Sequence, residues 1–277
     1  MRYATVMVSL ALDHPNEARL QVAGELAERF EAAIVGVAAA QFLPPLYFTD
    51  GTEAQALIDA GEASVKRQLA GLEAQFRAAT KNRGRHVEWR SALDFPARFV
   101  LAQARCADIV VSGGKSPAVS DAFSLASPKN LVLQAGRPLL VVPDRASGLD
   151  LRSVLVAWKD TPEARRAVAD ALPMLRKARD VTIVEIPEQD DDRSAVVAGV
   201  TDVAAWLGRH SVTATAHVSD AAADETPAAR LEKVAGDVGA GLIVAGAYGH
   251  SRFRELILGG VTQYLVTQSA RSVLLSH

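Results

Sequence analysis

The chain alternates between short apolar runs and longer segments in which apolar residues recur every three to four positions. The first pattern predicts buried strands and the second predicts amphipathic helices. Strands are expected at 5–10, 32–39, 86–91, 107–113, 138–143, 153–158, 180–186, 211–218, 241–246 and 272–276. Helices are expected at 16–32, 52–82, 95–106, 123–135, 162–178, 195–209, 227–238 and 260–269. This alternation predicts an α/β fold with mostly parallel sheets and crossover helices.

The same order of elements occurs twice along the chain. TVMVSL near the start of the first half corresponds to SVLVAW, CADIVVSGG corresponds to GAGLIVAGA, and GRPLLVVP corresponds to ARSVLLSH at the end. Such a repeat indicates a duplicated domain. We therefore expect two domains, 1–143 and 152–277, joined by the polar, glycine-containing linker DRASGLDLR.

Composition narrows the class of protein. With 277 residues, of which 49% are hydrophobic, the chain can form two globular domains with ample cores. Its 30 basic and 32 acidic residues are nearly balanced and no basic run stands out, so neither nucleic acid nor a membrane is an expected partner. The single cysteine, Cys106, cannot form an internal disulfide. We expect a cytoplasmic protein in which Cys106 is buried at a helix end.

The stretch GAYGHSRFRELILGG, residues 246–260, is the main candidate for chemistry. It follows an apolar strand and precedes a helix, and ligands of open parallel sheets bind beyond the carboxyl ends of strands. Glycine lets backbone N–H groups approach a phosphate closely, and a helix N-terminus favours an anion. The spacing matches neither the Walker loop nor the dinucleotide fingerprint. From the residues alone, a phosphate site and a structural turn remain equal alternatives.

The arrangement Gly246-x-x-Gly249, nine residues, Gly259, then a helix that begins at Gly260, resembles the nucleotide loop of universal stress proteins. The duplicated five-stranded pattern is similar to the tandem members of that family. The resemblance implies two open, mostly parallel α/β sandwich domains of the Rossmann-like, adenine nucleotide alpha hydrolase-like type. It also implies that the last strands of the halves, PLLVVP and SVLLS, pair in an intramolecular pseudo-dimer.

The resemblance further implies a ligand, ATP or another adenine nucleotide, with or without Mg²⁺. The residues implied around its ribose and phosphates are Gly246, Gly249, His250, Gly259, Gly260, Val261 and Thr262. The residues implied around its base are Ala157, Trp158 and Lys159, together with the segment 184–186 that contains Glu185.

The chain departs from the family pattern at several positions. Lys159 stands where the family usually has an acidic residue, and Gly260 stands where it has serine or threonine. In the first half, Gly113 and Gly114 are adjacent, no further glycine precedes the next helix, and Pro128 falls at that helix. We therefore expect the first half to have lost nucleotide binding.

Three classes of function stay open at this stage. The preferred class is a stress-response regulator whose second half binds an adenine nucleotide. The second is a scaffold or small-molecule sensor that binds no nucleotide and acts through protein partners, with or without homodimerisation. The third is a slow ATPase with His250 as a base, although no nucleophile and base occur in a recognisable pairing. The acidic run EQDDDR at 188–193 is expected to be a solvated connection rather than a metal site.

Overall fold

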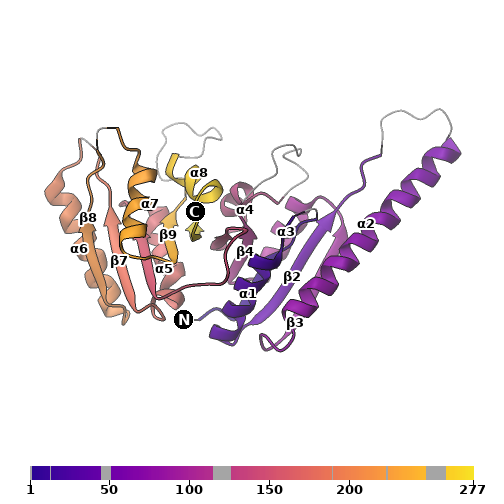
Figure 1. Cartoon of the computed structure of the whole chain (residues 1–277), viewed down its shortest axis with the longest axis horizontal. Helices are drawn as coiled ribbons and strands as arrows, with labels where there is room; N and C mark the ends of the chain where they lie inside the picture. Colours follow the sequence, from indigo (N-terminus) through magenta and orange to yellow (C-terminus); the bar gives the residue numbers. More distant parts are fainter. Residues whose placement is uncertain are drawn as a thin grey trace.

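The chain folds as two successive rounds of the same α/β pattern (Figure 1). The computed structural model describes residues 2–12, 14–44, 51–114, 126–188, 190–222, 224–247 and 260–277. The strands of the first half are β1 (Thr5–Ser9), β2 (Ala33–Ala40), β3 (Val87–Leu93), β4 (Ile109–Gly113) and β5 (Leu139–Val142). Its helices are α1 (Glu17–Phe30), α2 (Gly51–Ala79), α3 (Pro96–Gln103) and α4 (Pro128–Gln134), with a 3₁₀ turn at Ala104–Cys106.

The second half repeats this order. Its strands are β6 (Ser153–Ala157), β7 (Asp180–Glu185), β8 (Ala214–Val218), β9 (Leu242–Gly246) and β10 (Ser272–Ser276). Its helices are α5 (Pro162–Leu175), α6 (Arg193–Arg209), α7 (Pro227–Asp237) and α8 (Gly260–Thr267). The predicted mixed α/β fold with a mostly parallel sheet is therefore confirmed.

The strands of the described residues form one 10-stranded sheet in the order β3-β2-β1-β4-β5-β10-β9-β6-β7-β8. Every neighbouring pair is parallel except β5 and β10, which are antiparallel with Val141 opposite Val273 and Leu140 opposite Leu274. The final strands of the two halves therefore pair with each other, as the resemblance implied. Pairing also leaves neither apolar strand as an open sheet edge.

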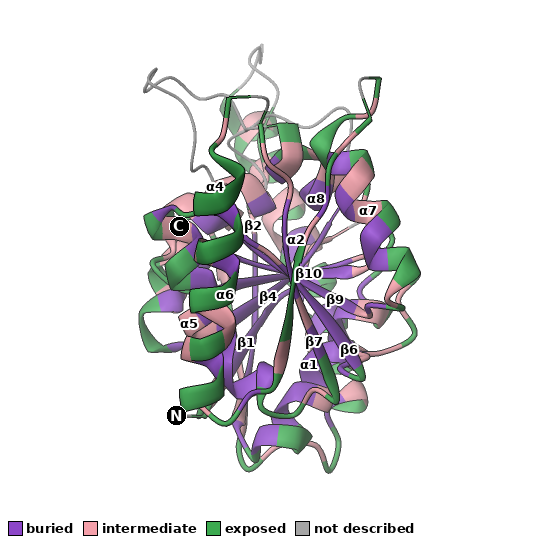
Figure 2. Cartoon of the chain, turned by 90° about the vertical axis from the view of Figure 1, so that its left-hand side faces the viewer, coloured by how far each residue is buried: buried purple, intermediate pink, exposed green. Residues whose placement is uncertain are grey.

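Helices cover both faces of the sheet, and Figure 2 shows the buried strands enclosed by helices whose outer sides are exposed. One face packs against α1, α2, α5 and α6, and the other packs against α3, α4, α7 and α8. Side chains of a strand alternate between the two faces, so Val6 and Val8 enter the first core while Met7 enters the second. Burial of both faces explains why the central strands read as nearly continuous apolar runs, whereas the edge strands β3 and β8 are only partly buried and carry polar residues.

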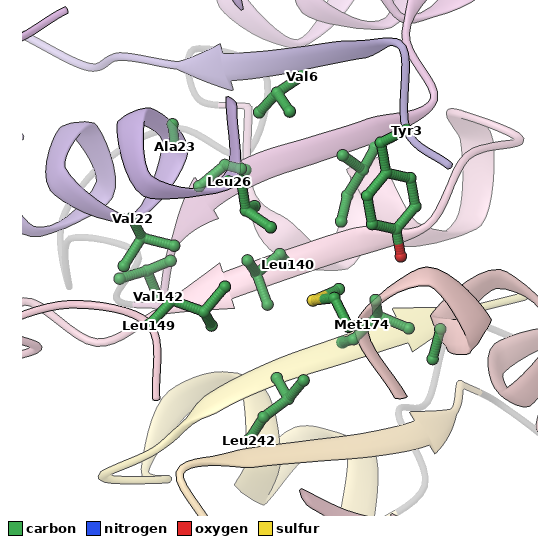
Figure 3. Packing of buried hydrophobic residues seen from close by; sticks show 14 of the residues in the cluster. Tyr3, Val6, Val22, Ala23, Leu26, Leu140, Val142, Leu149, Met174 and Leu242 are labelled. Atoms are coloured by element: carbon green, nitrogen blue, oxygen red, sulfur yellow. The ribbon is translucent and has the colours of Figure 1, made fainter. Parts of the chain in front are cut away.

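The first of these cores is continuous across the junction of the halves. Figure 3 shows Leu26 and Leu140 of the first half in the same cluster as Met174 and Leu242 of the second. The connection at 144–152 takes part, because Leu149 is only 2% exposed and its N–H donates to Glu25 Oε2 at 2.8 Å. The expected linker is thus packed onto α1.

Local sequence explains where several helices begin. Ser127, Thr161 and Thr226 each accept a hydrogen bond from the backbone N–H three residues later, and a proline follows each of them. A capping hydroxyl satisfies one of the unpaired N–H groups of the first turn, and proline at the first helical position loses no hydrogen bond. These caps therefore fix the residues at which α4, α5 and α7 begin.

One expectation is wrong. Cys106 lies at a helix end as predicted, but its side chain is exposed. The 3₁₀ turn directs Ala104 and Ala107, three residues apart, into the core and leaves Cys106 outside. In the part of the chain that the structure describes, no helix is both long and apolar enough to cross a membrane.

Candidate functional site

Strand order reverses at one point in each half, and these two points are the places where ligands of open α/β sheets bind. In the second half the point lies between β6 and β9, where Ala157 is opposite Ala245. Ala157 is also opposite Val184 of β7, one residue before Glu185. The fold therefore brings the predicted residues Ala157, Glu185 and Gly246 to neighbouring strand ends.

Gly246 is required by close packing as well as by its place at the strand end. A Cβ atom at this position would lie 2.5 Å from Ala164 N and 2.8 Å from Glu163 C, both in the backbone of the first turn of α5. Only glycine permits the end of β9 to approach the start of α5 this closely. The first glycine of the predicted loop thus allows the end of β9 to lie against the first turn of α5.

Glu185 is a nearly buried carboxyl group at the end of β7, with 5% of the residue exposed. Burial raises its pKa to about 6; Lys159 opposes this shift, while Asp191 and Asp160 add to it. No group in the described part of the chain donates a hydrogen bond to its carboxylate. A buried acceptor of this kind is available to a donor on a ligand.

Lys159 turns toward the loop that follows β7. Its Nζ lies 2.8 Å from Glu188 Oε1 and 3.3 Å from Asp191 Oδ2. Desolvation lowers the pKa of Lys159, but the hydrogen bonds to these two carboxylates outweigh it, so the pKa lies above its ordinary value. Two members of the acidic run thus pair with a lysine, and among the described residues no group of three or more acidic, histidine or cysteine side chains is placed to hold a metal.

Trp158 lies on the face of the sheet that packs against α1, α2, α5 and α6. Its backbone N–H donates to Val184 O at 2.8 Å, and its ring packs in the core cluster that contains Val168 of α5. The ring also lines a cavity of about 680 Å³ between α5 and α6. Its Nε1 is buried and has no hydrogen-bond partner among the described residues.

The predicted loop itself lies mainly outside the described residues, and so do Gly249, His250 and Gly259. Its far end is described, because α8 begins at Gly260. Gly260 is exposed, with no described atom within 4 Å of a Cβ built there, whereas Thr262 is only 6% exposed. Val261 between them is partly buried.

The first half contains a cleft that the sequence did not lead us to expect. A cavity of about 300 Å³ lies beside the ends of β1 and β4 and is lined by Ser9, Arg19 and Gly113 among others. Arg19 is only 6% exposed. A sequence signal for the burial of Arg19 was available, because Arg19 lies on the apolar face of α1. It precedes the buried Val22, Ala23 and Leu26 by three, four and seven residues, which is the spacing of one helix face.

Comparison with known proteins assigns the second half. The sequence model of the universal stress protein family matches residues 151–277. Residues 151–277 are therefore a universal stress protein domain. The match does not include residues 1–150. No curated protein sequence matches the chain significantly.

Solved structures extend the likeness of fold to the whole chain. A universal stress protein from Archaeoglobus fulgidus DSM 4304 is 16% identical with a TM-score of 0.70, covering 100% of this chain and 99% of that one. A putative universal stress protein from Pseudomonas aeruginosa UCBPP-PA14 is 14% identical with a TM-score of 0.57, covering 99% and 93%. A universal stress protein in complex with cAMP is 19% identical with a TM-score of 0.38, covering 51% and 98%. At these identities the first two likenesses show the fold of both halves.

Proposed function

We propose that the universal stress protein half binds ATP or another adenine nucleotide and that the chain is a stress-response regulator. The observation that carries the proposal is the position of Gly246. It ends β9 at the point where strand order reverses, and it begins the Gly-x₂-Gly-x₉-Gly pattern within the segment that belongs to the family. A glycine pattern at that place combines two independent requirements of a phosphate site.

The base is proposed to lie beside Glu185. The exocyclic amino group of adenine is a hydrogen-bond donor, and the nearly buried Glu185 carboxylate accepts none from the described residues. Ala157 and Lys159 are on the neighbouring strand end and its continuation. Trp158 contributes by supporting this strand end from the core rather than by stacking on the base. An adenine, which can donate a hydrogen bond to the Glu185 carboxylate, therefore fits this site better than a group that only accepts hydrogen bonds.

The ribose and phosphates are proposed to lie along the glycine pattern and the start of α8. Gly249, His250 and Gly259 would line the loop, and Gly260, Val261 and Thr262 form the first turn of the helix. The N-terminal N–H groups of a helix favour phosphate oxygens. Mg²⁺, where present, would be held chiefly by the phosphates, since it keeps several waters and needs few protein ligands.

The regulatory step follows from the same geometry. A nucleotide bound at these strand ends would change the surface that this end of the sheet, including the loop that lies mainly outside the described residues, offers to a protein partner. A partner could then distinguish the occupied site from the empty one. The pairing of β5 with β10 fixes the two halves in one sheet, so the surface would be presented on a rigid support.

The decisive variant is Gly259→Asp. It places a carboxylate beside the proposed phosphates, and we expect it to abolish binding of ATP while the protein stays folded. Gly208→Asp is the matched control, because Gly208 lies in α6 with open space around it. Small molecules released from the purified protein are identified by mass spectrometry, and ATP, ADP, AMP and cAMP are titrated calorimetrically. Equal affinities of the Gly259→Asp and Gly208→Asp proteins would refute the site.

The rival function is a scaffold or small-molecule sensor without a nucleotide. The observation that favours it is the pairing of Lys159 with Glu188 and Asp191, because this lysine replaces the usual acid of the family and bridges the two loops beside Glu185. Recovery of a non-nucleotide compound, with no heat from any adenine nucleotide, would favour it. A slow ATPase is tested by His250→Ala, which would stop turnover only if His250 acts on the attacking water.

A further inference from the structure

The cavity in the first half combines an apolar wall with one buried cation. Its lining includes Leu10 and Leu12 after β1, Val65 of α2 and Phe95 before α3. Arg19 is the only lysine or arginine that lines its described part. A volume of about 300 Å³ is at the lower end of the range of small-molecule sites, so the cavity suits a compact ligand.

Arg19 has no ion-pair partner among the described residues. The residue is 6% exposed, and no carboxylate within the described residues lies within salt-bridge distance of it. Burial lowers its pKa, and the exposed Asp144 and Glu17 offset this only through longer-range attraction. A buried and unpaired charge is costly to a fold, and such charges are normally paired or hydrogen-bonded.

The hydrogen bonds of the guanidinium group leave one edge available. Nη1 donates to Ser9 O at 3.1 Å. The other two nitrogens, Nε and Nη2, have no acceptor in the described part of the chain. The group lies over Gly113, where an added Cβ would be 2.7 Å from Cζ. The Nε–Nη2 edge of arginine is a planar fork that matches the two oxygens of a carboxylate.

We propose that this cavity binds a small organic acid, with its carboxylate on the Nε–Nη2 edge of Arg19 and its apolar body against Leu12, Val65 and Phe95. One fixed cation balances the single charge of a carboxylate, whereas a nucleotide would bring several charges into the same space. The site is separate from the nucleotide site proposed in the second half. It gives the half that lacks the glycine pattern a ligand of its own.

Titration calorimetry and thermal unfolding with benzoate, hexanoate and octanoate test the proposal in the full-length protein. At least one of these acids is expected to bind and raise the unfolding temperature. Benzamide, hexanamide and octanamide are expected to bind roughly 10- to 100-fold more weakly than the matching acids, because they lack the charge that strengthens the bonds to Arg19. Absence of binding by all three acids, or equal binding of acid and amide, overturns the proposal.

Arg19→Met keeps the length of the side chain and removes its charge, and it is expected to weaken acid binding by the same factor. Arg83→Met is the matched control, because Arg83 lies in the same half and bonds to Gln21 and Glu28 outside the cavity. If Arg19→Met does not fold, Ala40→Phe fills the cavity from the end of β2 and is expected to abolish binding. Wild-type affinity in a folded Arg19→Met or Ala40→Phe protein overturns the assignment.

Two competitors separate this site from other anion sites. Inorganic phosphate and ATP are not expected to displace the bound acid, and Gly259→Asp is expected to bind it with wild-type affinity. Displacement by phosphate at equal concentration would show that the cavity is a general anion site, and it would overturn the proposal that the ligand is a small organic acid. Displacement by ATP that persists in Gly259→Asp would make it a nucleotide site. Loss of ATP binding alone in Gly259→Asp leaves the acid site standing, so the two proposals fail independently.

Discussion

The two halves keep a glycine at the same strand end and use it differently. Gly113 ends β4 and Gly246 ends β9, and each faces the third residue of the first helix of its half, Arg19 or Ala164. At Gly113 the neighbour is the guanidinium group of Arg19; at Gly246 it is the backbone of Ala164. The space gained by omitting a side chain therefore holds a charged group in one half and a closer helix in the other.

The buried charges near the corresponding strand ends of the two halves are also opposite. The register of β1 with β2 and of β6 with β7 makes Ala38 the counterpart of Glu185. The first half thus has a buried cation, Arg19, and an alanine at this strand end, whereas the second has a nearly buried carboxyl. A duplicated fold can therefore keep its topology while the ligand chemistry of each copy is set by one or two buried side chains.

The largest expected effect comes from adding a methyl group at Gly246, with the same change at Gly113 as its comparison. Gly246→Ala is expected to lower the free energy of unfolding by about 2–3 kcal/mol, because its Cβ meets backbone that cannot move without shifting α5. Gly113→Ala is expected to cost about 1 kcal/mol or less, because the end of the Arg19 side chain can swing away. Urea unfolding measures both. Equal losses would show that the two glycines are not used differently.

A smaller effect is expected from Glu185→Gln. The pKa of Glu185 is raised from 4.5 to about 6, so between these values the folded chain holds a proton that the unfolded chain has released. The free energy of unfolding therefore falls as pH rises through this window and stays lowered above it. Removing the charge should raise stability at pH 7 by about 1–2 kcal/mol and leave it unchanged at pH 4.

Unfolding of both proteins across pH 4 to 8 measures this difference. Glu188→Gln is a suitable control, because Glu188 is exposed beside the same lysine. A Glu185→Gln protein with the same pH dependence as the wild type would contradict the burial of a charged group at the end of β7.

The smallest effect is expected from Lys159→Met. The ion pair of Lys159 with Glu188 and Asp191 is partly exposed, so its loss should cost under about 1 kcal/mol. Lys159 also holds down the pKa of Glu185, so that pKa should rise further and the stability transition should move to higher pH. Lys233→Met, at an exposed position of α7, is the control. An unmoved transition would show that Lys159 does not act on Glu185.

Much of the fold could be predicted from sequence because its signals are local. Strands with both faces buried read as apolar runs, and the Pro162 and Pro227 starts follow capping threonines. The repeat placed β5 and β10 at corresponding positions, and their pairing followed from the resemblance. The domain boundaries stay a prediction, since one sheet and a continuous core run across the junction.

The candidate sites could be predicted only in part. The strand ends and the glycine pattern were visible in the sequence, but the use of Gly246 depends on its distance from Ala164 in three dimensions. Likewise, Arg19 becomes a candidate only once its guanidinium is seen over Gly113. The pairing of Lys159 with Asp191 was missed because it joins loops 32 residues apart, although opposite charges after neighbouring strands were a usable signal.

The most direct test of the account is the stoichiometry of ATP binding by titration calorimetry to the wild-type, Gly259→Asp and Arg19→Met proteins. The account predicts one site per chain in the wild type, none in Gly259→Asp and one of unchanged affinity in Arg19→Met. Two equivalent sites per chain, or one site that survives Gly259→Asp and is lost in Arg19→Met, would contradict the assignment of the nucleotide to the second half.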